Sequence, residues 1–203
     1  MFMNLRSFSV IGAALVAVLL FTVATPAHAD VFWDKASVLK SFFAKSQRVT
    51  YRRLHLEAAQ VEAVRKRLGY APAADLTVYY GLTDGKADGV AILDDERGQH
   101  EPISFAVLIG PDGVMQRLEV MVYREAYGDE VREPRFRNQF RGKTPQDATR
   151  VGQDIVAIAG ATISSKAMAV GARRALAVTD EVLFKPGIAQ VLGLTPPPAA
   201  AKP

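Results

Sequence analysis

The stretch from Leu76 to Tyr123 constrains the fold most, because short apolar segments alternate there with turn signals. β-branched and aromatic residues form four segments of strand length, and Asp84-Gly85 and Pro111-Asp112-Gly113 are typical of tight turns. Strands joined by such short turns pair in antiparallel order. We therefore predict a meander with strands at residues 76–80, 89–93, 103–109 and 114–123, and a polar loop at residues 94–99.

Helical patterns flank this meander on both sides in the sequence. Apolar residues recur at helical spacing in residues 30–44, 57–68 and 164–182, and Gly69 provides a stop for the second helix. We expect further strands at residues 48–56 and 154–158, and a short helix at residues 135–140 behind Pro134. The predicted fold class is α+β, with a twisted antiparallel sheet and flanking helices.

The N-terminus has the pattern of a secretory signal peptide. Arg6 precedes an apolar run from Val10 to Val23, and the tripeptide Ala27-His28-Ala29 follows. A positive start, a short apolar region and an A-x-A site are the features that signal peptidase recognises. We predict cleavage after Ala29 and a periplasmic protein, whereas an uncleaved segment would act as a membrane anchor.

Composition and pattern divide the chain into four parts. We assign residues 1–29 to the signal peptide, 30–70 to an N-terminal segment of helix and strand, and 71–192 to the main domain. The Pro- and Ala-rich residues 193–203 form a tail that we expect to be disordered.

Composition also narrows the chemistry. The chain has no cysteine, which excludes disulfides and thiolate metal sites, and His55 and His100 are far apart in the sequence, so we expect no metal site. The formal charge is +4, and removing Arg6 with the leader leaves 24 basic minus 21 acidic residues, or +3. Because these charges are interspersed and no nucleic-acid-binding module is present, we expect no nucleic-acid partner.

A cluster of hydroxyl residues marks the junction between a loop and the last long helix. Gly160-Ala161-Thr162-Ile163-Ser164-Ser165 combines a permissive glycine with free backbone N–H groups at a helix start. The plainest interpretation is that Ser164 or Ser165 caps the helix. The same geometry also makes an anion site. The spacings of a Walker A loop and of a serine-hydrolase elbow are both absent.

In this sequence, G-A-T-I-S-S comes shortly after D-I-V-A-I. This segment resembles the flavin-attachment motif of the FMN-binding domain family. The segments Y-R-E-A-Y-G-D-E-V-R and R-F-R-N-Q-F-R-G-K, and the strand pairs with D-G-K-A-D-G-V-A and G-P-D-G-V-M, resemble the same family. The resemblance extends from residue 48 to residue 182. The family includes periplasmic subunits of the Na⁺-translocating NADH:quinone reductase and Rnf-type complexes, and small exported flavoproteins.

This resemblance implies an FMN cofactor joined through a phosphoester to Thr162. The modifying partner would be a Mg²⁺-dependent FAD:protein FMN transferase, and the redox partner a membrane redox complex or a periplasmic electron carrier. The resemblance implies an electron-transfer protein rather than a stand-alone catalyst, so no catalytic residue is expected. The other residues expected at the cofactor are Gly160, Ala161, Ile163, Ser164, Ser165, Glu125, Tyr127, Gly128 and Lys143.

Two positions depart from the family pattern. Val156 stands where the family has an aspartate, and Ala159 where it has serine or threonine, while Asp154 lies two residues earlier than the family's aspartate. Three alternatives to covalent FMN therefore stay open. They are non-covalent FMN, a flavin-free accessory module that binds a membrane complex, and a phospho-ligand binder that uses the same helix start.

Overall fold

The chain folds around one antiparallel sheet. The computed structural model describes residues 29–185 and 188–194, so the predicted signal peptide up to residue 28 and the tail from residue 195 lie outside the described residues. The six strands have the order β1-β6-β5-β4-β3-β2. Their bounds are β1 Asp30–Val31, β2 Arg48–His55, β3 Asp75–Thr83, β4 Lys86–Arg97, β5 Pro102–Ile109 and β6 Met115–Tyr123.

The meander from β3 to β6 is confirmed. Asp84 and Gly85 connect β3 to β4 with φ values of 50° and 78°, the positive values that a tight hairpin turn requires at both central positions. Gly113 has a φ of 75° in the turn between β5 and β6. The turn chemistry visible in the sequence therefore determines the order of these four strands.

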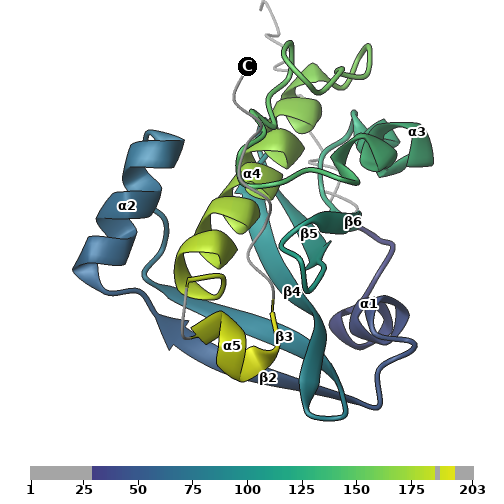
Figure 1. Cartoon of the computed structure of the whole chain (residues 1–203). Coiled ribbons are helices and arrows are strands. Elements are labelled where there is room, and N and C mark those ends of the chain that lie inside the picture. The colour runs from purple at the N-terminus through teal and green to yellow at the C-terminus, as the bar shows by residue number, and fades with distance from the viewer. Residues whose placement is uncertain (1–28, 186–187, 195–203) are drawn as a thin grey trace, which may run out of the picture.

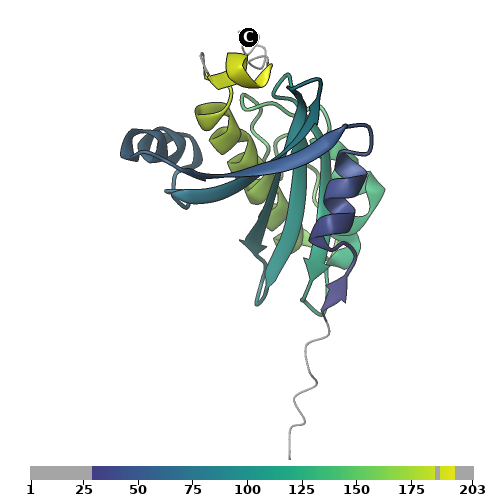
Figure 2. The same cartoon turned by 90° about the horizontal axis from the view of Figure 1, so that it is seen from below.

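Helices cover the two faces of the sheet unequally (Figures 1 and 2). The long helix α4 packs across one face, where α2 and α5 lie beside it, and α1 packs on the other face. Short helices η1, α3 and η2 follow β6. The helix bounds are α1 Lys35–Phe42, α2 Ala58–Leu68, η1 Asp129–Arg132, α3 Pro134–Arg137, η2 Asn138–Phe140, α4 Thr162–Val182 and α5 Ile188–Leu192.

Two apolar clusters hold these layers together. The larger one lies between α4 and the sheet and includes Phe105, Phe136 and Met168, which are all fully buried. The smaller one lies under α1 and includes Val38 and Phe42. Within residues 29–185 and 188–194, no helix is both long and apolar enough to cross a membrane.

Three local predictions are wrong. The first helix begins at Lys35 rather than near residue 30, because Asp34 accepts a hydrogen bond from the Ser37 N–H and Asp30–Val31 pairs with β6. The predicted loop at residues 94–99 is largely strand, since β4 continues to Arg97. The predicted strand at residues 154–158 is a turn with one isolated bridge between Val151 and Ile155.

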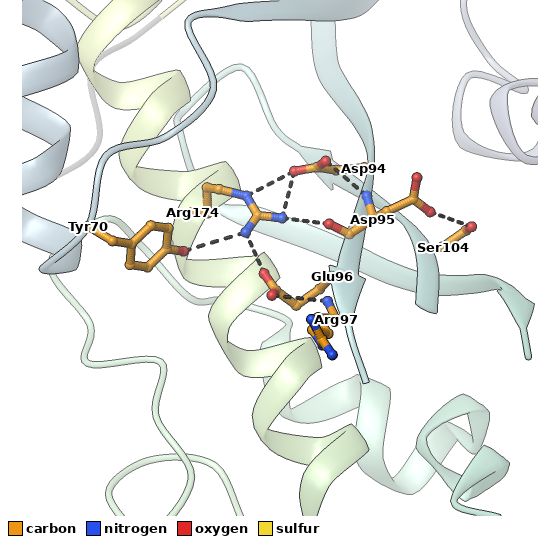
Figure 3. Close-up of polar contacts among 7 residues, drawn as sticks. All are labelled: Tyr70, Asp94, Asp95, Glu96, Arg97, Ser104 and Arg174. Atoms are coloured by element: carbon orange, nitrogen blue, oxygen red, sulfur yellow. Dashed lines mark hydrogen bonds and ion pairs between the residues drawn. The ribbon is translucent and has the colours of Figure 1, made fainter. Parts of the chain in front are cut away.

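The extension of β4 has a tertiary cause (Figure 3). Arg174 of α4 donates to the Asp94 carboxylate at 2.9 Å and to the Asp95 carbonyl at 3.0 Å, and it also pairs with Glu96. The Arg174 side chain is only 15% exposed. The carboxylates that made this segment look like a loop therefore bind a cation from the opposite layer.

Candidate functional site: the start of α4

The hydroxyl cluster lies at the first turn of α4. Gly160 precedes the helix with a φ of 84°, and Ala161 is the N-cap residue, with no side-chain hydrogen bond to the helix end. The prediction that Ser164 or Ser165 caps the helix is therefore wrong, because α4 begins two residues earlier, at Thr162. The N–H groups of the first turn have no carbonyl acceptor within the helix, and they point out of the N-terminus of a 21-residue helix.

The three hydroxyl residues differ in exposure. Thr162 is exposed, whereas Ser164 and Ser165 are 5% and 0% exposed. Ser165 Oγ accepts a hydrogen bond from the Ile158 N–H at 3.2 Å. Ser164 Oγ lies 2.7 Å from the hydroxyl of Tyr123. Of the three hydroxyls, Thr162 is thus the one that a second protein can reach, and the two serines hold the loop and the helix together.

Tyr123 joins this helix start to the loop after β6. Its hydroxyl donates to the Tyr127 carbonyl at 2.6 Å. Because a carbonyl only accepts, the single Tyr123 proton is used there, and the Tyr123 oxygen accepts from Ser164. Burial is the main reason why the pKa of Tyr123 is raised. The hydroxyl therefore stays protonated and keeps both contacts.

Gly128 allows the loop after β6 to lie close to the first turn of α4. It has a φ of 97°, and a Cβ at this position would lie 2.7 Å from both Ser164 Oγ and Tyr123 Oη. Only glycine fits there without displacing these two side chains. Three of the predicted residues, Gly128, Ala161 and Ser164, therefore meet at one point.

Exposed apolar side chains come from each segment that meets at this helix start. Tyr127 is 87% exposed, Val156 74% and Ile163 48%. Gln139 fixes the backbone of Val156 from both sides, since its side-chain amide accepts from the Val156 N–H at 2.8 Å and donates to the Val156 carbonyl at 3.1 Å. The loop after β6, the segment before α4 and the first turn of α4 thus each carry one exposed apolar side chain.

Glu125 and Lys143 are engaged in contacts within the protein. Glu125 Oε1 accepts from the N–H groups of His100 and Glu101 at 2.6 and 3.1 Å. Burial acts to raise the pKa of Glu125, but these N–H groups outweigh it and lower the pKa. Glu125 and Lys143 both lie in the segment that is expected near the cofactor, but their charges form contacts that stabilise loops of the protein.

Lys143 holds the turn that leads toward α4. Its Nζ lies 2.8 Å from Asp154 Oδ2, which also accepts from the Thr149 N–H at 2.9 Å. Burial acts to raise the pKa of Asp154, but the hydrogen bond from Lys143 and those from Arg150 and Thr149 lower it below its usual value. Asp154 is therefore occupied in shaping this turn.

Tyr123 belongs to this site although its sequence context did not predict it. Tyr123 is the last residue of β6, and the strand pattern does not show that its hydroxyl contacts α4. The available signal was an aromatic residue with a polar tip at the end of a strand next to a charged loop. Such residues bury the ring and find a hydrogen-bond partner.

Comparison with known proteins gives a family match and a similar solved structure. Residues 98–177 match the model of the FMN-binding domain family, and this segment contains every predicted site residue. This match indicates an FMN-binding domain in the segment, with FMN as its cofactor. Among solved structures, the chain resembles the crystal structure of Shewanella oneidensis NqrC, with 20% identity, 75% of this chain and 85% of that chain covered, and a TM-score of 0.44. No curated protein matches the chain.

The described residues fit an FMN phosphate at the start of α4. The first-turn N–H groups and the helix dipole favour an anion. Gly160 carries no side chain that would limit approach, and nothing lies within 4 Å of where its Cβ would be. Tyr127, Val156 and Ile163 offer apolar area of the kind that a flavin ring would cover.

Proposed function

We propose that the chain is an exported flavoprotein that carries FMN on Thr162 through a phosphoester and transfers electrons in a membrane-associated redox chain. One observation carries this proposal. Thr162 is the exposed hydroxyl of the cluster, at the N-terminus of a long helix and within the segment that matches the FMN-binding domain family. A modifying enzyme needs an accessible hydroxyl, and the buried serines do not offer one.

The attachment step balances with FAD as the co-reactant. The Thr162 oxygen attacks the phosphorus atom of the FMN half of FAD, and a Thr–O–P bond forms. The pyrophosphate P–O bond breaks, AMP leaves, and the threonine hydroxyl loses its proton. The FAD:protein FMN transferase would supply the Mg²⁺ site and the base for this step. This chain would supply the acceptor oxygen and the anion-favouring helix start.

The residues of the chain then hold and orient the cofactor. The N–H groups of Ile163 and Ser164 would donate to phosphate oxygens. Tyr123 and Ser164 keep the helix start and the loop after β6 together, so the exposed Tyr127 stays near the attachment point. FMN, when bound, supplies one- and two-electron redox chemistry. A solvent-facing position suits exchange with a partner protein.

The location and partners belong to the same proposal. The signal-peptide pattern of residues 1–29 supports export to the periplasm. A phosphoester bond suits that compartment, because it prevents loss of the cofactor by dissociation. The redox partner would be a membrane redox complex or a periplasmic electron carrier.

A comparison of variants tests the proposal. The full chain is exported in a host that expresses the transferase, and the protein is precipitated with acid before its visible spectrum is recorded. We expect flavin absorbance that stays with the pellet, that is lost in Thr162→Val, and that is reduced but present in Ser164→Ala. Flavin in the supernatant would refute the phosphoester. A colourless wild-type protein would favour the accessory-module alternative.

A further inference from the structure

A pocket that lies away from the start of α4 is rich in arginine. It has a volume of 240 Å³ and is bounded by the end of α2, the middle of α4 and residues 144–153. Arg67, Arg150 and Arg173 line it, together with the single carboxylate of Asp147. Three guanidinium groups therefore share a small space with one acidic group.

Two of the charged groups on this pocket are already engaged. Arg67 donates to Asp180 Oδ2 at 2.7 Å and to the Pro145 carbonyl at 2.9 Å. Asp147 Oδ2 accepts from both the N–H and the hydroxyl of Thr144 at 2.7 Å. Among the described residues, Asp147 forms no ion pair with Arg150 or Arg173.

Arg173 is left without an acidic partner in the part of the chain that the structure describes. Its one hydrogen bond goes from Nη2 to the Leu68 carbonyl at 3.2 Å, and its Nε is buried with no acceptor. Burial and, after it, the positive charge of Arg150 lower the pKa of Arg173. A buried donor of this kind costs free energy unless a ligand satisfies it.

The neighbouring residue shows what a satisfied arginine looks like in this fold. Arg174 has Asp94 and Glu96 as ion-pair partners and the Asp95 carbonyl as a further acceptor (Figure 3). The charges of these carboxylates raise the pKa of Arg174 although burial opposes them. Arg173, one position earlier on α4, instead donates to the Leu68 carbonyl and lies near the positive charge of Arg150.

We propose that this pocket binds a small oxyanion of the phosphate class, held by Arg150 and Arg173. Guanidinium groups present paired N–H donors that match the oxygens of such an anion. A bound anion would provide an acceptor for the buried Nε and neutralise the two facing cations. The volume suits inorganic phosphate or a small phosphate monoester rather than a flavin.

This site is separate from the proposed flavin attachment point. Arg173 lies about three turns after Thr162 on α4, which corresponds to about 16 Å along the helix axis. The FMN phosphate at the helix start therefore cannot fill the arginine pocket. The proposal stands independently of whether Thr162 carries FMN.

Calorimetric titration of the flavin-loaded protein with inorganic phosphate, at constant ionic strength, tests the site. We expect one binding event, weakened about tenfold or more in Arg150→Gln and in Arg173→Gln, because each change removes charge-assisted hydrogen bonds. Arg53→Gln is the matched control, since Arg53 is exposed and forms no ion pair among the described residues. Its affinity for phosphate should equal that of the wild type.

Two further arms identify the ligand and guard against misfolding. Glycerol 3-phosphate, titrated in the same way, distinguishes a monoester ligand from free phosphate by tighter binding. Arg150 is exposed, so Arg150→Gln keeps the test valid if Arg173→Gln does not fold. Thr162→Val should keep the Arg150-dependent binding, which separates this site from the flavin. Absence of phosphate binding, or equal weakening in Arg53→Gln, would overturn the proposal.

Discussion

Tyr123 shows how one hydroxyl group can organise the residues of a site. It donates to the Tyr127 carbonyl at 2.6 Å and lies 2.7 Å from Ser164 Oγ, so it connects the loop after β6 to the first turn of α4. Both serines of the cluster are buried in contacts of this kind, whereas Thr162 is exposed. Burial, rather than residue type, thus separates the exposed Thr162 hydroxyl from the two serine hydroxyls that hold the structure together.

Tyr123→Phe should lower the free energy of unfolding by about 1–3 kcal/mol, because it leaves the Ser164 hydroxyl and the Tyr127 carbonyl without their partner. Urea denaturation measures this change. Tyr51→Phe is the control, since Tyr51 is 58% exposed, and it should change the value by less than about 0.5 kcal/mol. Equal effects of the two substitutions would show that the Tyr123 hydrogen bonds contribute nothing.

Asp154→Asn should destabilise the protein by about 1–3 kcal/mol at neutral pH, because Lys143 and two backbone N–H groups lose a charged acceptor. The folded-state pKa of Asp154 is lowered, so its contribution is present above the unfolded pKa and is lost as pH falls through the folded pKa. The difference between variant and wild type should therefore shrink below roughly pH 4.

The measurement is denaturant unfolding of both proteins at a series of pH values. Asp88→Asn is the control, because this exposed carboxylate accepts only a side-chain hydrogen bond from Thr83. Its effect at neutral pH should stay below about 0.5 kcal/mol. A difference for Asp154→Asn that grows as pH falls would contradict the assignment.

At the scale of elements, the contact between the loop after β6 and α4 depends on glycine. Gly128 and Gly142 both have positive φ values, 97° and 85°, but only Gly128 has atoms where a Cβ would be. Gly142→Ala therefore measures backbone strain alone, and Gly128→Ala measures strain plus steric conflict with Tyr123 and Ser164.

Gly142→Ala should cost about 1 kcal/mol of unfolding free energy, and Gly128→Ala should cost at least about 2 kcal/mol more. Thermal unfolding of the two variants provides the comparison. Gly128→Ala should also reduce flavin content, since it separates the loop from the helix start. Equal destabilisation by the two substitutions would mean that the loop can move away from α4 freely.

Elements with local signals could be predicted from the sequence, and those set by distant contacts could not. The Asp84-Gly85 dipeptide predicted the turn between β3 and β4, and Gly69 predicted the end of α2. The acidic residues 94–97 indicated a loop, because the sequence does not show that Arg174 of α4 pairs with Asp94 and Glu96 in the folded chain. The segment that begins at Asp154 was predicted as a strand, because the contact between Lys143 and Asp154 that shapes the turn cannot be recognised in the sequence.

At the scale of the whole molecule, Arg174 joins the helical layer to the sheet (Figure 3). Arg174→Met should lower the free energy of unfolding by about 3 kcal/mol, because Asp94 and Glu96 would face each other without a cation. Urea unfolding tests this. Arg135→Met removes a highly exposed pair with Glu133 and should cost less than about 0.5 kcal/mol. A small cost for Arg174→Met would show that the two layers do not depend on this link.

The candidate site combines local and distant information in the same way. Thr162 and its glycine could be recognised in the sequence, because the motif is contiguous. The separate roles of Ser164 and Ser165 could not, because they depend on Tyr123 and Ile158, which approach only in the folded chain. The contacts of Glu125 with the His100 N–H and of Lys143 with Asp154 could not be predicted either, and the place of both residues at the cofactor stays a prediction.

The most direct test of the central claim is fragment mass spectrometry of the exported protein after proteolysis, in a host that expresses the transferase. We predict one FMN less one water on the peptide that contains residues 160–166, with the fragment ions placing it on Thr162. FMN on Ser164 or Ser165, or an unmodified peptide from a host with active transferase, would contradict the account.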